Sequence, residues 1–139
     1  MRFDLPSPDF DTAPWWDAVR RHRLLIRRCR SCAEPHFYPR PFCPSCWSTD
    51  VTWEDASGRA TLYTYSIVRV NDLPPFPERV PYVAAVVDLA EGPRMMTNVV
   101  DCDFDDLAIG MPLTVKYRDV GDGITIPVFI PVFAPETWA

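Results

Sequence analysis

The chain has 139 residues, of which 47% are hydrophobic and 24% charged, as is usual for a soluble globular protein. No apolar run reaches the ~18 residues that a membrane-spanning helix needs, so a membrane partner is not expected. Residues 1–6 lack the hydrophobic core of a signal peptide, and we therefore expect a cytoplasmic protein.

The formal net charge of −5 is distributed unevenly along the chain. Residues 15–46 hold seven arginines and two acidic residues, whereas residues 47–139 hold six basic and fourteen acidic ones. A basic ribbon on an acidic body favours a local anion site over a general nucleic-acid surface.

The N-terminal third begins with a polar, proline-containing stretch, residues 1–11, which predicts a flexible arm. A helix is expected over residues 13–22. Thr12 can cap this helix, and Pro14 in its first turn gives up only an N–H that has no helical partner. Asp17 near its start and the arginines near its end suit the helix dipole.

After a short strand at residues 23–28, four cysteines form two C-x2-C pairs, Cys29 with Cys32 and Cys43 with Cys46. Two such pairs can surround one zinc ion, and a reducing cytoplasm favours metal ligands over disulfides. Four thiolates leave no open coordination position, so the zinc is expected to be structural. Iron in a rubredoxin-like site and unligated thiols are the alternatives. Cys102 is interpreted as a buried, small apolar residue.

A stiff connector with two prolines, residues 37–42, joins the two pairs. Residues 47–57 are mostly polar and are expected to contain the junction with a second unit. Beyond them, β-branched and aromatic runs separated by turns predict five strands, at residues 60–70, 82–89, 94–100, 113–119 and 124–132.

A proline-rich loop over residues 71–81 and a short acidic helix over 103–110 interrupt these strands. Five strands with a helix between the third and fourth match a small Greek-key barrel of the OB type. Pro127 and Pro131 argue for an edge or bulged position of the last strand.

The predicted fold is therefore mainly β, with an N-terminal helix, a zinc ribbon and a five-stranded OB-fold barrel that includes a short helix. The expected domains are the arm at residues 1–11, the helix plus zinc ribbon at 12–56, and the barrel at 57–139.

Eight short segments have a characteristic pattern: LIRRCRSC (25–32), YPR (38–40), CPSC (43–46), SGRA (57–60), PY (81–82), EGPR (91–94), IGMP (109–112) and IPVF (126–129). Together they resemble one family, the bacterial and archaeal acyl-CoA-associated zinc-ribbon/OB-fold proteins known as "domain of unknown function 35". Two departures from the family pattern are Ala33, where glycine is usual, and Tyr38-Pro39, where two prolines are usual.

The resemblance implies a rubredoxin-like zinc ribbon and a role as an accessory subunit. Such proteins bind thiolase-like enzymes, including thiolases, hydroxymethylglutaryl-CoA synthase, acyltransferases and steroid side-chain aldolases, and some are fused to hydratase subunits. They are thought to scaffold the complex and to contact coenzyme A (CoA) or its thioesters. The expectation is thus an essential, non-catalytic subunit of a hetero-oligomeric acyl-CoA-processing complex.

Five residues near the cysteines are candidates for binding acyl-CoA. Arg28, Arg30 and Arg40 could hold its phosphates, although a solvated basic face or ion pairs with a partner would explain them as well. Phe37 and Tyr38 could stack on adenine or line a pantetheine channel, and packing against the barrel is the alternative.

Candidates for a partner interface are large apolar side chains, because exposed apolar patches usually mark interfaces. Trp15 and Trp16 are adjacent, so one is expected to dock on the body and the other to meet a partner. Phe76 in the proline-rich loop, and Phe129 and Phe133 near the C-terminus, complete the set.

No catalytic residue is predicted. His22 and His36 have no nucleophile beside them in sequence, and the clustered cysteines are committed to metal. Independent catalysis on a thioester is the least supported alternative. Binding of single-stranded nucleic acid is another alternative, but a basic groove is not expected in an acidic barrel with one lysine, Lys116.

Overall fold

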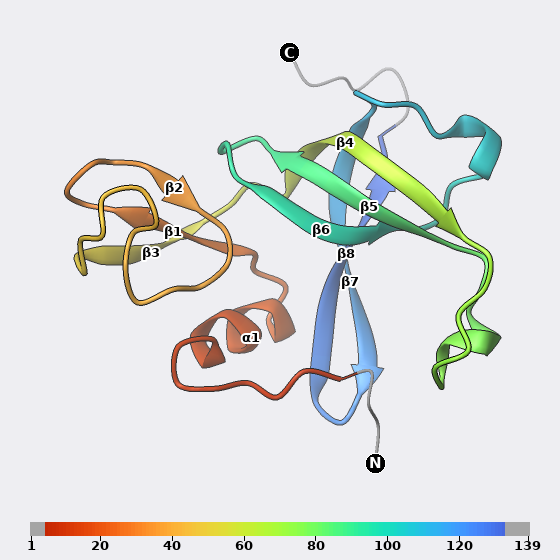
Figure 1. Cartoon of the computed structure of the whole chain (residues 1–139), viewed down its shortest axis with the longest axis horizontal. Helices are drawn as coiled ribbons and strands as arrows, with labels where there is room; N and C mark the ends of the chain where they lie inside the picture. The colour runs from red at the N-terminus through yellow and green to blue at the C-terminus, as the bar shows by residue number, and fades with distance from the viewer. Residues whose placement is uncertain (1–4, 133–139) are drawn as a thin grey trace.

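The computed structural model describes residues 5–132 as a small sheet and a barrel joined end to end (Figure 1). Helix α1 (Ala13–Arg20) lies beside both and packs against strands of each. The small sheet has the order β2-β1-β3, formed by β1 (Leu25–Cys29), β2 (Pro35–His36) and β3 (Val51–Asp55). It carries the metal-binding loops at its outer end.

The second unit is a closed five-stranded barrel with the strand order β4-β5-β6-β8-β7. This confirms the predicted fold class. The short helix expected at residues 103–110 is only a 3-10 turn, η2, and a second 3-10 turn, η1, interrupts the proline-rich loop. The bounds are β4 (Arg59–Val68), η1 (Phe76–Glu78), β5 (Tyr82–Leu89), β6 (Arg94–Val99), η2 (Phe104–Asp106), β7 (Pro112–Gly121) and β8 (Ile124–Pro131).

Alternating burial along the strands builds the barrel core. In β5, Val83, Ala85, Val87 and Leu89 are buried and the residues between them are half-buried, because successive side chains point to opposite faces of a strand. Phe129 of β8 is fully buried among them. Within residues 5–132, no helix is long and apolar enough to cross a membrane.

Helix α1 ends two residues earlier than predicted. His22 adopts the left-handed conformation, with φ of 63°. The N–H of His22 donates to the Val19 carbonyl and the N–H of Arg23 donates to the Ala18 carbonyl, both at 2.9 Å. This is the Schellman motif, which ends a helix and supplies N–H donors to the carbonyls of its last turn.

The cap at the start of α1 also differs from the prediction, because the Thr12 side chain does not cap the helix. Its hydroxyl accepts the Asp9 N–H at 3.0 Å, while the Asp9 carboxylate accepts the Thr12 N–H at 2.9 Å. The two residues form a reciprocal capping box one turn earlier.

Strand β3 was not predicted, since residues 47–57 have few apolar residues. It exists because it pairs with β1 over its whole length, from Cys29 opposite Val51 to Leu25 opposite Asp55. Across this pair the Arg27 guanidinium lies 4.0 Å from the centre of the Trp53 ring. A cation–π contact and backbone pairing therefore define a strand that local sequence does not indicate.

The two prolines of β8 do not mark an edge, because the barrel is closed. The backbone nitrogen atoms of these prolines face β6, which pairs with β8 at Val99 and Phe129. The Pro127 carbonyl accepts the Thr97 hydroxyl of β6 at 3.1 Å, so its missing N–H also faces this sparsely paired side.

Contacts around the junction hold the ribbon against the barrel. The N–H of Ser57 donates to the Glu91 carboxylate at 2.9 Å, and the N–H of Ala56 donates to the Leu24 carbonyl at 2.8 Å. Glu91 lies in the turn between β5 and β6, so this barrel turn is bonded directly to the chain leaving the ribbon.

Candidate metal centre and apolar groove

The two cysteine loops have the same backbone geometry. Ala33 and Trp47 follow the second cysteine of each pair and have φ of 67° and 68°. The Ala33 N–H donates to the Cys29 carbonyl at 2.9 Å, and the Trp47 N–H donates to the Cys43 carbonyl at 2.8 Å. Each loop therefore folds as a tight knuckle that turns both of its sulfurs inward.

All four sulfur atoms gather in one place, within 4.8 Å of one another. The Sγ atoms of Cys29 and Cys46 are 3.6 Å apart, as are those of Cys32 and Cys43. With Zn–S bonds of about 2.3 Å, a tetrahedral site places its sulfurs about 3.8 Å apart. The donor set therefore fits a zinc ion without rearrangement.

Backbone donors stabilise the thiolate form inside the cluster. The N–H groups of Cys32 and Ser31 point at Cys29 Sγ, at 3.5 and 3.3 Å, and lower the pKa of this thiol to about 6. The Ser45 N–H points in the same way at Cys43 Sγ, at 3.4 Å. A backbone N–H lowers the pKa of the Cys32 and Cys46 thiols as well, but burial and the neighbouring sulfurs raise it above its ordinary value. Thiolates are the form that binds metal, so these two cysteines would lose their protons when an ion binds.

The predicted CoA-binding arginines have different surroundings. Arg28 donates to the Glu54 carboxylate through Nε and Nη2 and to the Ala33 carbonyl through Nη1, at 2.7 Å. Its guanidinium thus serves the fold of the ribbon rather than a free anion. Arg30 lies 3.9 Å from Asp50, and Arg40 is exposed beside Tyr38 and Pro39.

Four aromatic residues singled out from the sequence meet in a groove of about 380 Å³ between α1, the ribbon and the barrel. Trp15 is buried, and its indole N–H donates to the Leu25 carbonyl at 3.1 Å. Its ring makes edge contacts with Trp16 and Phe37, at 4.7 and 5.7 Å between centroids. Tyr38 is 49% exposed at the rim.

The barrel wall of the groove was missed by sequence reasoning. It consists of β6 residues, among them Met95 and the exposed Met96, and of Ile126 and Pro127 from β8. Two adjacent methionines on a strand were a usable signal, because methionine is frequent at adaptable binding surfaces.

Polar side chains in this wall are already satisfied. The Thr97 hydroxyl donates to a carbonyl of β8, and the Asn98 amide donates to the Val83 carbonyl at 2.9 Å. The groove therefore offers an apolar surface that suits an aliphatic or aromatic occupant.

The remaining interface candidates lie elsewhere. Phe76 of η1 lines a separate cavity of about 840 Å³ on the barrel, next to Tyr82. The prediction for Phe129 is wrong, because its side chain is fully buried in the barrel core and cannot meet a partner. Phe133 lies outside the described residues.

Comparison with known proteins finds two family models that follow one another along the chain. Residues 16–52 match the family described as "ChsH2, rubredoxin-like zinc ribbon domain", and residues 53–118 match "ChsH2, C-terminal OB-fold domain". The chain belongs to this ChsH2 (DUF35) family. Together with the sulfur cluster, the ribbon match supports a structural zinc ion.

Relatives within the ChsH2 family include enzyme subunits and scaffolds. A probable enoyl-CoA hydratase alpha subunit from Thermomonospora curvata is 36% identical over 94% of this chain, but the chain spans only 40% of that protein's length. A 3-oxo-4,17-pregnadiene-20-carboxyl-CoA hydratase alpha subunit from Mycobacterium tuberculosis is 36% identical over 84% of the chain and 37% of its own length. A DUF35 domain-containing scaffold protein from Methanocaldococcus jannaschii is 35% identical, over 79% of this chain and 81% of the scaffold.

Solved structures agree with the family. An Ltp2–ChsH2(DUF35) aldolase structure superposes with a TM-score of 0.82 at 36% identity, covering 91% of this chain and 98% of the matched one. A DUF35 protein from Sulfolobus solfataricus shares the fold, with a TM-score of 0.62 at 11% identity. The relatives thus include proteins named as hydratase subunits and as scaffolds, and one solved structure is an aldolase that combines ChsH2 with Ltp2.

Proposed function

We propose that this chain is an accessory subunit that binds a thiolase-like or hydratase enzyme and completes an acyl-CoA-processing complex. The observation that carries the proposal is the apolar groove, which elements distant in sequence build jointly and whose polar side chains are already bonded. The relatives support it, since two are subunits of CoA-ester hydratases and another accompanies an aldolase. A reducing, cytoplasmic setting suits the thiolate cluster.

The zinc ion has a structural part in this proposal. Four sulfur donors leave no position for a substrate, so the ion would hold the two knuckles together and supply no Lewis acid. Catalytic groups then belong to the enzyme subunit, and the hetero-oligomer is the active species.

Direct contact with the CoA thioester forms the finer part of the proposal. Tyr38 at the groove rim and the exposed Arg40 two residues later are the best-placed candidates. The groove would take the pantetheine or acyl chain and Arg40 a phosphate, whereas Arg28 is held by Glu54 and Ala33.

Co-expression with a defined enzyme tests the subunit role. The chain is produced with Ltp2, and separately with each thiolase-like or hydratase enzyme that a survey of its neighbouring genes identifies, and each pair is passed over a sizing column. We expect a stoichiometric complex and enzyme activity that depends on the chain. Elution of the chain alone from both mixtures, with the activity of each enzyme unchanged, would overturn the proposal.

The CoA contact is tested on the complex by comparing Arg40→Gln with Arg28→Gln. The first is expected to raise the KM for an acyl-CoA about 10-fold, because it removes one charge-assisted phosphate contact. The second should weaken the ribbon instead, seen as a lower unfolding temperature. An unchanged KM in Arg40→Gln argues against phosphate binding by this residue.

A further inference from the structure

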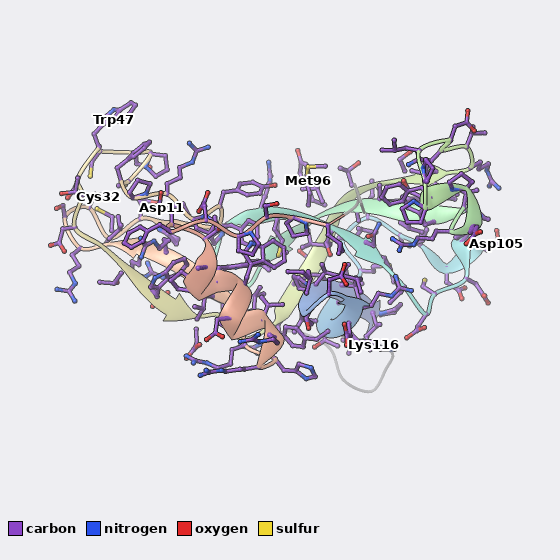
Figure 2. The ribbon with its side chains drawn as sticks, turned by 90° about the horizontal axis from the view of Figure 1, so that it is seen from below. Asp11, Cys32, Trp47, Met96, Asp105 and Lys116 are labelled. Atoms are coloured by element: carbon purple, nitrogen blue, oxygen red, sulfur yellow. The ribbon has the colours of Figure 1, made fainter. Side chains whose placement is uncertain are left out.

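Trp47 occupies the outer tip of the zinc ribbon, where its side chain is 74% exposed. Figure 2 shows it projecting from the end of the molecule that carries Cys32, on the same side as Met96 of the apolar groove. It was not among the residues that the sequence suggested for an interface.

The backbone at Trp47 makes this placement costly. The second knuckle needs a residue with positive φ, and Trp47 takes a φ of 68° that a bulky side chain disfavours. The first knuckle holds the small Ala33 at the equivalent position. Glycine would satisfy either knuckle without strain, so the metal site gives no reason for an indole here.

Packing does not account for the indole either. The Trp47 ring stacks on the ring of Phe42, with 5.3 Å between their centroids and 13° between their planes. The two rings form an aromatic plate, in which Phe42 is half-buried and most of the Trp47 surface faces solvent. An exposed residue in a strained conformation is a reason to look for a function.

The surroundings of the plate have the composition of a protein–protein interface. Residues 37–49 contain four aromatic residues and a single charged one, Arg40. Interface centres are depleted in charge, and their energetic hot spots are enriched in Trp, Tyr and Arg. Two other arginines of the ribbon, Arg28 and Arg30, face Glu54 and Asp50, which leaves little free positive charge for a phosphate polymer, whose binding depends on neutralising several phosphates.

From this geometry we propose that Trp47 is an anchor through which the ribbon docks on the enzyme subunit. Its indole enters an apolar pocket of that subunit. Phe42 holds the ring in the bound orientation before contact, which lowers the entropy lost on docking. The inference rests on the proposed accessory role and specifies its contact surface.

The test compares the two knuckles by matched substitutions. Trp47→Gly and Ala33→Gly both place glycine at a left-handed position, but only the first removes an exposed side chain. We expect Trp47→Gly to weaken binding to the neighbouring-gene enzyme or to Ltp2 by about 30-fold or more, the size of a hot spot. Ala33→Gly should leave the dissociation constant unchanged, and Trp47→Phe should give an intermediate value.

Zinc content and unfolding temperature are measured on every variant, so that a damaged ribbon is recognised. If the glycine variant loses metal, Trp47→Asn replaces it in the comparison, because asparagine also tolerates positive φ. Equal binding by wild type and Trp47→Gly overturns the inference alone. If Trp47→Gly and Ala33→Gly weaken binding equally, the inference is also overturned, because the loss then comes from the backbone change and not from the indole. Absence of binding by the wild type overturns the proposed function and the inference with it.

Discussion

The zinc ribbon and the barrel are stabilised in different ways. The barrel closes on itself around an apolar core, in which Leu113 and Phe129 are fully buried. The ribbon has three short strands, one of only two residues, and its outer loops converge on four sulfur atoms. A sheet this small buries too little to hold its loops, so a metal ion must supply the energy that the barrel obtains from burial.

This difference has a functional consequence. A loop held by a metal ion can expose aromatic side chains that a small apolar core would otherwise need. Trp47 at the knuckle tip and Tyr38 at the groove rim are both exposed, whereas the barrel needs large side chains such as Phe129 for its core and exposes others, including Met96. The ribbon can therefore present a surface that continues the exposed barrel wall of the groove.

Removing one metal ligand should produce the largest contrast between the two units. We expect Cys43→Ser to lose zinc, because three thiolates and a weak hydroxyl make a poor site. Metal supplies about 10–16 kcal/mol in zinc-finger peptides, far more than a three-stranded sheet can replace. Hydrogen exchange should then show loss of protection over residues 25–55 and retained protection over 59–131.

Chelation of zinc in the wild type is the matching experiment and should give the same exchange pattern reversibly. Cys102→Ser is the control, since Cys102 lies outside the sulfur cluster and should leave the zinc content at one per chain. Simultaneous unfolding of the barrel would show that the two units are not independent.

Truncating a side chain of the barrel core should destabilise the barrel and leave the ribbon intact, the opposite of removing a metal ligand. Phe129→Ala is expected to lower the free energy of unfolding of the barrel by about 3–5 kcal/mol, the usual cost of a large buried cavity. Zinc should remain bound, because the ribbon has its own source of stability. Denaturant titration with parallel zinc analysis makes the comparison, and Ile130→Ala, at a half-buried neighbour, should cost much less. Loss of zinc at the same denaturant concentration would contradict separate stabilisation.

The junction between the units should be the next most sensitive point. Gly58 has a φ of 86°, and a β-carbon there would lie 2.5 Å from Cγ1 of Val115 in β7. Gly58→Ala therefore combines backbone strain with a steric clash and should cost about 2–4 kcal/mol. Gly110→Ala has similar φ, 89°, but open space around it, so only about 1–2 kcal/mol is expected. Equal unfolding free energies for the two variants would show that the clash is relieved.

The smallest effect is expected from Ala33→Gly in the first knuckle. Removing the β-carbon relieves about 1–2 kcal/mol of strain in the left-handed conformation. The greater flexibility of glycine in the unfolded chain destabilises the folded state by about 0.5–1 kcal/mol. A net stabilisation of about 0.5 kcal/mol should appear as a slightly higher unfolding temperature of the zinc-loaded ribbon. A lower temperature would mean that the Ala33 methyl group packs usefully.

Sequence reasoning was most successful where the signal is local. Cysteine spacing identified the four sulfurs that the fold gathers, and runs of β-branched and aromatic residues between turns located all five barrel strands. It failed at β3, whose pairing with β1 depends on residues more than twenty positions away. It also placed Phe129 at a surface, because an apolar run near a terminus does not reveal which of its faces is covered.

By itself, the sequence determined which four cysteines cluster, where the barrel strands lie and that the fold is mainly β. These depend on neighbours a few residues apart, through loop reach and the two-residue period of a strand. Only the tertiary structure decided which side chains are available to a partner. Arg28 is held by Glu54, Trp15 is buried, and Trp47 and Tyr38 face solvent. Exposure and ion pairing result from the packing of distant segments, which no local pattern encodes.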